Sequence, residues 1–109
     1  MGSPTRIPIA CDMTGAPDTP AERLAEYRRL FAEALIGRER TADGIRFRFG
    51  SAPGVEEWVR DLAAREKACC PFFEFAVGTD GGEVRWDTTV LVERARPILE
   101  AFYALAGGV

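Results

Sequence analysis

The residues best suited to chemistry are cysteines in two places along the chain. Cys69 and Cys70 are adjacent and directly precede Pro71, and Cys11 follows the short apolar run 7–10. Thiolates act as nucleophiles, redox groups and ligands for soft metal ions. An adjacent pair can bind one soft ion, or can place one thiol in the core and the other in a cleft. Three thiolates suit mercury(II) or arsenic(III), whereas structural zinc takes four ligands.

Glu66 is the acidic residue that we expect beside these thiols. It precedes them by three and four residues, so on a helix its carboxylate lies on the same face. If it is buried it needs a ligand, a proton or a partner on another element, such as Arg46 or Arg48. If the protein is an enzyme, we expect Glu66 to be catalytic, with Asp12 as an alternative proton donor. The other interpretation of Glu66 is a surface position at the edge of the helix stripe.

The expected electrostatics disfavour spontaneously ionised thiols. A helix C-terminus carries partial negative charge, and Glu66 adds more. A bound soft cation would reverse this, because a thiol that coordinates a metal is deprotonated outright. The pattern therefore favours binding of a soft ion over an activated nucleophile. The alternative is that Cys69 and Cys70 are two small apolar side chains of the core.

Composition limits the classes of function. The 109 residues are 47% hydrophobic and 28% charged, which is typical of one globular domain, and we expect residues 1–6 and 106–109 to be tails. A net charge of −3 argues against nucleic-acid binding. We expect no membrane span and no secretory signal, and therefore a cytoplasmic protein. The absence of histidine excludes Ser-His-Asp and Cys-His mechanisms and the commonest metal ligand.

Hydrophobic patterning predicts an α+β fold in the order β-α-β-α-β-β-α. The expected elements are a strand at 7–10, a helix from a capping box at 19–22 to Gly37, a strand at 44–49, a helix from 53–54 to Pro71, a hairpin of strands 73–77 and 84–90, and a helix from Pro97. They suggest a two-layer sandwich with a four-stranded, mixed or mostly antiparallel sheet and helices on one face. The other face is open to solvent or to a second copy in a homodimer.

Three stretches carry a resemblance to a known family. Ile9-Ala10-Cys11, the run 40–49 and the run from Glu66 to Phe72 resemble small bacterial proteins that share an Ile-Ala-Cys strand end and a Glu-x-x-Cys-Cys-Pro-Phe helix end. The similarity spans roughly residues 7–104. It implies an association with heavy-metal and metalloid resistance, and it implies that the site comprises Cys11, Glu66, Cys69 and Cys70. It implies no particular reaction.

The first functional interpretation is therefore a cytoplasmic binding protein without turnover. In it, Cys11, Cys69 and Cys70 bind mercury(II) or arsenic(III), and no resident cofactor is needed. An enzyme that uses the thiols with Glu66 or Asp12 remains open, either for cleavage of an organomercurial carbon–metal bond or for dithiol redox chemistry. A small-ligand or protein-interaction module with structural cysteines is the third interpretation.

Overall fold

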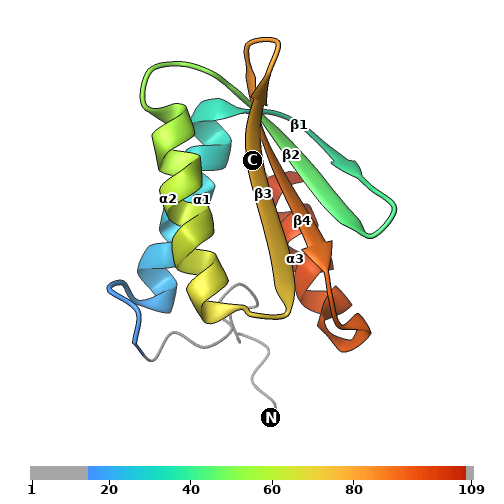
Figure 1. Ribbon diagram of the computed structural model, residues 1–109. Helices are drawn as coiled ribbons and strands as arrows, with labels where there is room; N and C mark the ends of the chain where they lie inside the picture. Colours follow the sequence, from blue (N-terminus) through green and yellow to red (C-terminus); the bar gives the residue numbers. More distant parts are fainter. Residues whose placement is uncertain (1–14, 108–109) are drawn as a thin grey trace.

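The computed structural model describes residues 15–107, so the strand expected at 7–10 lies outside the described residues. The elements are α1 (Pro20–Ala34), β1 (Leu35–Arg40), β2 (Gly44–Gly50), α2 (Val55–Cys69), β3 (Phe73–Asp80), β4 (Glu83–Val90), the 3-10 turn η1 (Glu93–Ala95) and α3 (Arg96–Gly107) (Figure 1). The four strands form one antiparallel sheet in the order β1-β2-β4-β3. The predicted α+β fold is confirmed.

The chain contains two successive units of a helix followed by a hairpin. The first is α1-β1-β2 and the second is α2-β3-β4, and the inner strands β2 and β4 pair antiparallel. This arrangement leaves β1 and β3 as the two edges of the sheet. The two long helices lie side by side, where Arg65 of α2 donates to Glu26 of α1 at 2.7 Å (Figure 1).

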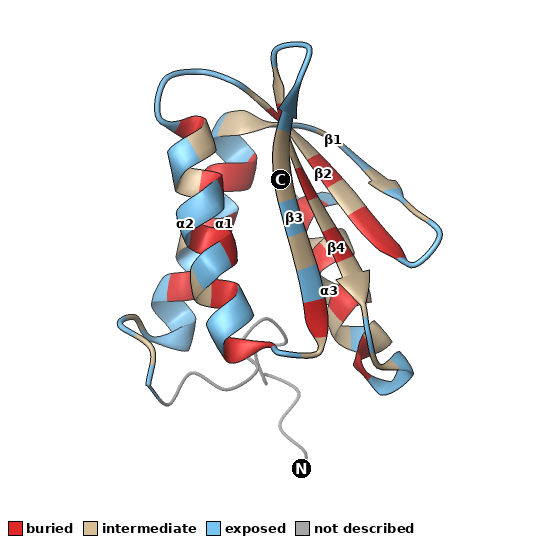
Figure 2. Ribbon diagram, in the orientation of Figure 1, coloured by how far each residue is buried: buried red, intermediate tan, exposed pale blue. Residues whose placement is uncertain are grey.

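Alternation along the strands directs one face of the sheet into the core. The buried side chains of the inner strands are Ile45, Phe47, Phe49, Val84, Trp86 and Thr88 (Figure 2). Aromatic rings from the helices pack on them: Phe31 of α1 contacts Phe47 at 5.1 Å between ring centroids, and Tyr27 stacks on Trp86 at 6.0 Å. Phe102 of α3 joins the same cluster. The core thus unites α1, α3 and both inner strands.

The opposite face of the sheet carries paired charges. Arg46 donates to Asp87 at 2.7 Å, and Arg48 donates to Glu83 at 3.2 Å. The phenylalanines that alternate with these arginines are buried, so β2 has one face in the core and one charged face.

Local turn signals were reliable, but the first helix ends earlier than expected. Gly81 and Gly82 adopt positive φ in the β3–β4 hairpin, which matches the predicted turn. The expectation that Gly37 closes the first helix is wrong: α1 ends at Ala34, and Gly37 lies within β1, where a side chain would collide with the Arg48 guanidinium. At the other end, α3 includes Ala106, which is buried although the sequence assigned it to a tail.

Candidate functional site

The end of α2 positions the candidate site. The buried stripe of this helix runs through Leu62, Glu66 and Cys69. Pro71 disfavours helical geometry at the residue before it, and Cys70 indeed leaves the helix with φ −124° and ψ 76°. Its N–H still donates to the Glu66 carbonyl at 2.8 Å, so the last turn stays closed. The predicted end of this helix before Pro71 is confirmed.

Glu66 is buried, with none of its surface exposed, which decides against a surface role. Its Oε1 accepts hydrogen bonds from Nη1 of Arg23 at 2.7 Å and from the hydroxyl of Tyr27 at 3.2 Å. Its Oε2 lies 3.2 Å from Sγ of Cys70. The expected partners Arg46 and Arg48 were wrong, because both side chains lie on the opposite face of the sheet and pair with acids there.

Arg23 is the functional residue that the sequence reasoning missed. Its side chain is fully buried and is shared between two acids, because Nε and Nη2 donate to Asp18 at 2.6 and 2.8 Å while Nη1 donates to Glu66. The signal was its position four residues before Tyr27 on the buried stripe of α1. A charge on the apolar stripe of each helix indicates that each needs a partner, although it does not identify the two as a pair.

Burial determines the pKa of the Glu66 carboxyl group. Loss of hydration raises the pKa of Glu66 to about 7, although the hydrogen bond and charge of Arg23 act in the opposite direction. Arg23 also donates to Asp18, and this hydrogen bond lowers the pKa of Asp18. Burial and the nearby carboxylate raise the pKa of Tyr27 well above 10, so its hydroxyl stays a neutral donor. The carboxyl group of Glu66 therefore exchanges its proton near neutral pH.

The two adjacent cysteines are in different states. Cys70 is disulfide-bonded, whereas Cys69 is a buried free thiol, so the neighbours are not bonded to each other. A disulfide sulfur carries no hydrogen, so the contact between Cys70 and Oε2 is a hydrogen bond only when Glu66 holds the proton. The carboxylic acid then donates to the sulfur, while Oε1 keeps its two donors. Cys11 and Asp12 lie outside the described residues.

The surroundings of the two sulfurs also differ. Cys70 faces the Glu66 carboxylate, whereas Cys69 lines a hollow of about 230 Å³ together with Arg65, Ala68 and residues 15–17. Across residues 15–107, no three cysteine or acidic side chains are grouped so as to hold a metal ion. Convergence of Cys11 with the adjacent pair stays a prediction.

Fold and site together define an α+β protein with a buried, proton-exchanging carboxylate beside a cysteine sulfur. Comparison of the chain with family models, curated proteins and solved structures finds no match. Between residues 15 and 107, no helix has both the length and the apolar character to cross a membrane. The site itself is therefore the basis for assigning a function.

Proposed function

We propose that this protein carries out thiol–disulfide exchange, with Cys70 as a reacting sulfur and Glu66 as the group that holds its proton. The observation that carries the proposal is the 3.2 Å contact between Sγ of a disulfide-bonded Cys70 and Oε2 of a carboxyl group whose pKa is about 7. A proton carrier should titrate near the working pH, because it must both release and recover the proton.

Cys11 is the proposed sulfur partner of Cys70. The chain contains three cysteines, and Cys69 is free, which leaves Cys11 as the intrachain candidate. Alkylation tests this without reductant: denatured protein should take up one label, on Cys69, and reduced denatured protein should take up three. A peptide that links residues other than Cys11 and Cys70 would refute the pairing.

The exchange can be written as a balanced sequence. A small thiol attacks the Cys11 sulfur as its thiolate, the disulfide breaks, and Cys70 leaves and takes the proton from Oε2 of Glu66. A second thiol attacks the mixed disulfide as its thiolate and releases Cys11 as a thiolate together with the oxidised small disulfide. The two protons that the small thiols gave up to solvent return to Cys11 and to Glu66. Overall, one protein disulfide and two small thiols give two protein thiols and one small disulfide. Complete burial suits Cys70 to the role of leaving group rather than point of attack.

The test measures reduction by a small thiol at pH 6–8, followed by alkylation and mass spectrometry. Cys70→Ser should abolish exchange, and the matched control Cys69→Ser should preserve it. Glu66→Gln should slow the step that releases Cys70 by about 10²-fold, the lower range for general acid catalysis. An unchanged rate and pH profile in Glu66→Gln would exclude the proton-carrier role.

Binding of mercury(II) or arsenic(III) by the reduced protein is the second candidate. The supporting observation is again Oε2 of Glu66, which can accept the proton that a metal ion displaces from Cys70. Titration of reduced protein with mercury(II), followed by thiolate charge-transfer absorption, should show a site that needs Cys11 and Cys70, while Cys69→Ser measures any third ligand. Loss of organomercurial cleavage in Glu66→Gln, with metal binding retained, would extend this candidate to catalysis.

A further inference from the structure

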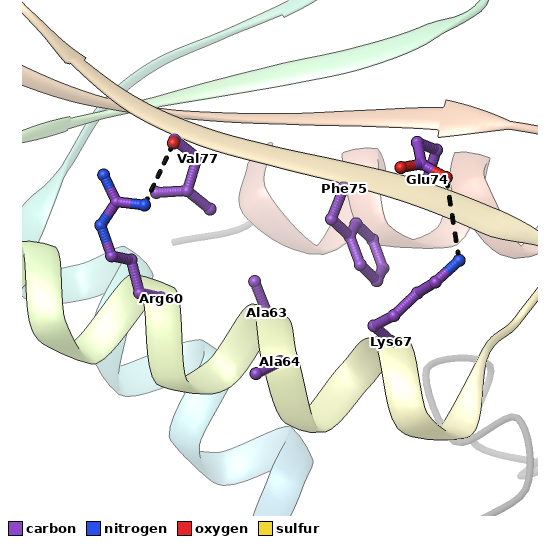
Figure 3. A pocket seen from close by; sticks show the side chains of 7 residues that line it. All are labelled: Arg60, Ala63, Ala64, Lys67, Glu74, Phe75 and Val77. Carbon is purple, nitrogen blue, oxygen red and sulfur yellow. Dashed lines mark hydrogen bonds and ion pairs between the residues drawn. The ribbon is translucent and has the colours of Figure 1, made fainter.

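A cleft of about 320 Å³ lies between α2 and the edge strand β3 (Figure 3). The helix contributes the small side chains of Ala63 and Ala64, and the strand contributes Phe75 and Val77. Phe75 projects into the space between the helix and the strand (Figure 3). A cleft of this volume, with an apolar middle, is within the range that small organic ligands occupy.

Two cations mark the ends of the cleft. Arg60 donates to the carbonyl of Val77 at 3.2 Å (Figure 3). Lys67 donates to the carbonyl of Phe73 at 2.7 Å. Glu74 is the acid in the lining, 3.9 Å from the Lys67 amine. With two cations and one anion, the lining favours a ligand with an acidic group.

Phe75 separates this cleft from a second, inner hollow. Its ring lines both spaces, and the inner one, of about 10 Å³, has room for one water molecule at most. The other walls of the inner hollow are Tyr27, Phe47, Trp86, Thr88 and Phe102. Phe75 is half-buried on an edge strand, with its ring against those of Phe73 and Trp86, and a change of its side-chain rotamer is the movement that would join the two spaces.

Trp86, one of the residues that line the inner hollow, carries an unsatisfied polar group. Trp86 is 2% exposed, and its indole Nε1 has no hydrogen-bond partner among residues 15–107. Phe75 meets the indole edge-to-face at 5.8 Å between ring centroids, which is a weak substitute for a hydrogen bond. Buried donors are almost always paired, so this N–H is a place where a ligand acceptor would bind favourably.

We propose that the cleft binds a small, flat aromatic acid that carries a second oxygen at its far end. The ring enters when Phe75 rotates, the far oxygen accepts from the Trp86 N–H, and the carboxylate stays between Arg60 and Lys67. No cysteine is among the described residues of this lining, and the one residue shared with the proposed thiol site is Tyr27, which lines the inner hollow and donates to Glu66.

Nuclear magnetic resonance of ¹⁵N-labelled full chain tests this with 6-hydroxy-2-naphthoate as the probe. The chain has two tryptophans and therefore two indole N–H signals. Trp86 should shift downfield on titration, and Trp58, whose N–H donates to Glu26 at 2.8 Å, should stay in place. 2-Naphthoate, which lacks the far hydroxyl, should bind about 3- to 10-fold more weakly, the effect of one buried hydrogen bond. A Trp86 signal that stays in place at millimolar probe would overturn the proposal.

Two variants locate the probe. Ala64→Leu adds bulk at an exposed helix position that lines the cleft, so the fold should persist while affinity falls at least about 10-fold. Trp86→Phe keeps a ring but loses the N–H, and it should bind both naphthoates equally. Unchanged binding to Ala64→Leu, or a retained preference in Trp86→Phe, would place the probe elsewhere and refute the proposed site.

Discussion

Replacement of Glu66 by glutamine should abolish the pH dependence of stability that this residue imposes. The pKa of its carboxyl group is 4.5 in an ordinary environment and about 7 in the folded protein. The folded state therefore binds the proton more tightly, so the contribution of Glu66 to folding is complete below pH 4.5 and is lost as the pH rises through 7. At about 1.4 kcal/mol per pH unit, the interval from 4.5 to about 7 amounts to about 3 kcal/mol.

Urea unfolding between pH 4 and 8, with the disulfide intact, measures this difference directly. Because glutamine does not titrate, the free energy of unfolding of Glu66→Gln relative to that of the wild type should rise by about 3 kcal/mol from pH 4 to pH 8. Glu57→Gln, at an exposed position on the same helix, is the matched control and should stay within about 0.5 kcal/mol of the wild type throughout. Parallel curves for wild type and Glu66→Gln between pH 5 and 8 would refute the buried, proton-exchanging carboxyl group.

Three further substitutions test the surroundings of this group. Arg23→Met removes the buried cation from Glu66 and should cost about 3–5 kcal/mol in urea unfolding at pH 8, with a smaller loss at pH 5; an equal loss at both would contradict the pairing. Tyr27→Phe removes one donor to Oε1, so carbon-13 titration should show a higher pKa of Glu66, and a lower one would be inconsistent with the contact. Thr19→Ala breaks the capping box of α1 and should cost about 1 kcal/mol in thermal unfolding followed by circular dichroism; no measurable cost would show that the cap is dispensable.

Local signals in the sequence predicted much of the fold. Proline after the adjacent cysteines fixed the end of α2, and the glycine pair marked the β3–β4 hairpin. The strand β1 was not predicted because the chain passes directly from helix to strand at Leu35, without a turn residue between them. Whether the chain continues as a helix or becomes a strand after Ala34 depends on pairing with β2, which is a tertiary effect that local propensity does not contain.

The site was predicted in part, for the same reason. Spacing along one helix placed Glu66 next to Cys70, and the structure confirms that contact. The partner of Glu66 is 43 residues earlier in the sequence, on a different helix, and no local pattern indicates which of many arginines it is. A charge on an apolar helix stripe therefore predicts that a partner exists, while identifying Arg23 requires the packing of α1 against α2.

Neutralisation of Arg23 does not account for the carboxyl group of Glu66. Asp18 alone already gives Arg23 an ion pair through two hydrogen bonds, so Glu66 is not needed to neutralise a buried cation. Because Arg23 is shared with Asp18, its charge does not fully offset the cost of burying the Glu66 carboxylate. The folded protein therefore loses stability at neutral pH, and a glutamine at this position would avoid that loss. Glutamine could still accept from Arg23 and Tyr27 through its amide oxygen, but it could not exchange a proton with the sulfur of Cys70. What the carboxyl group adds over its neutral isostere is therefore a titrating proton on Oε2, at the one oxygen that faces sulfur.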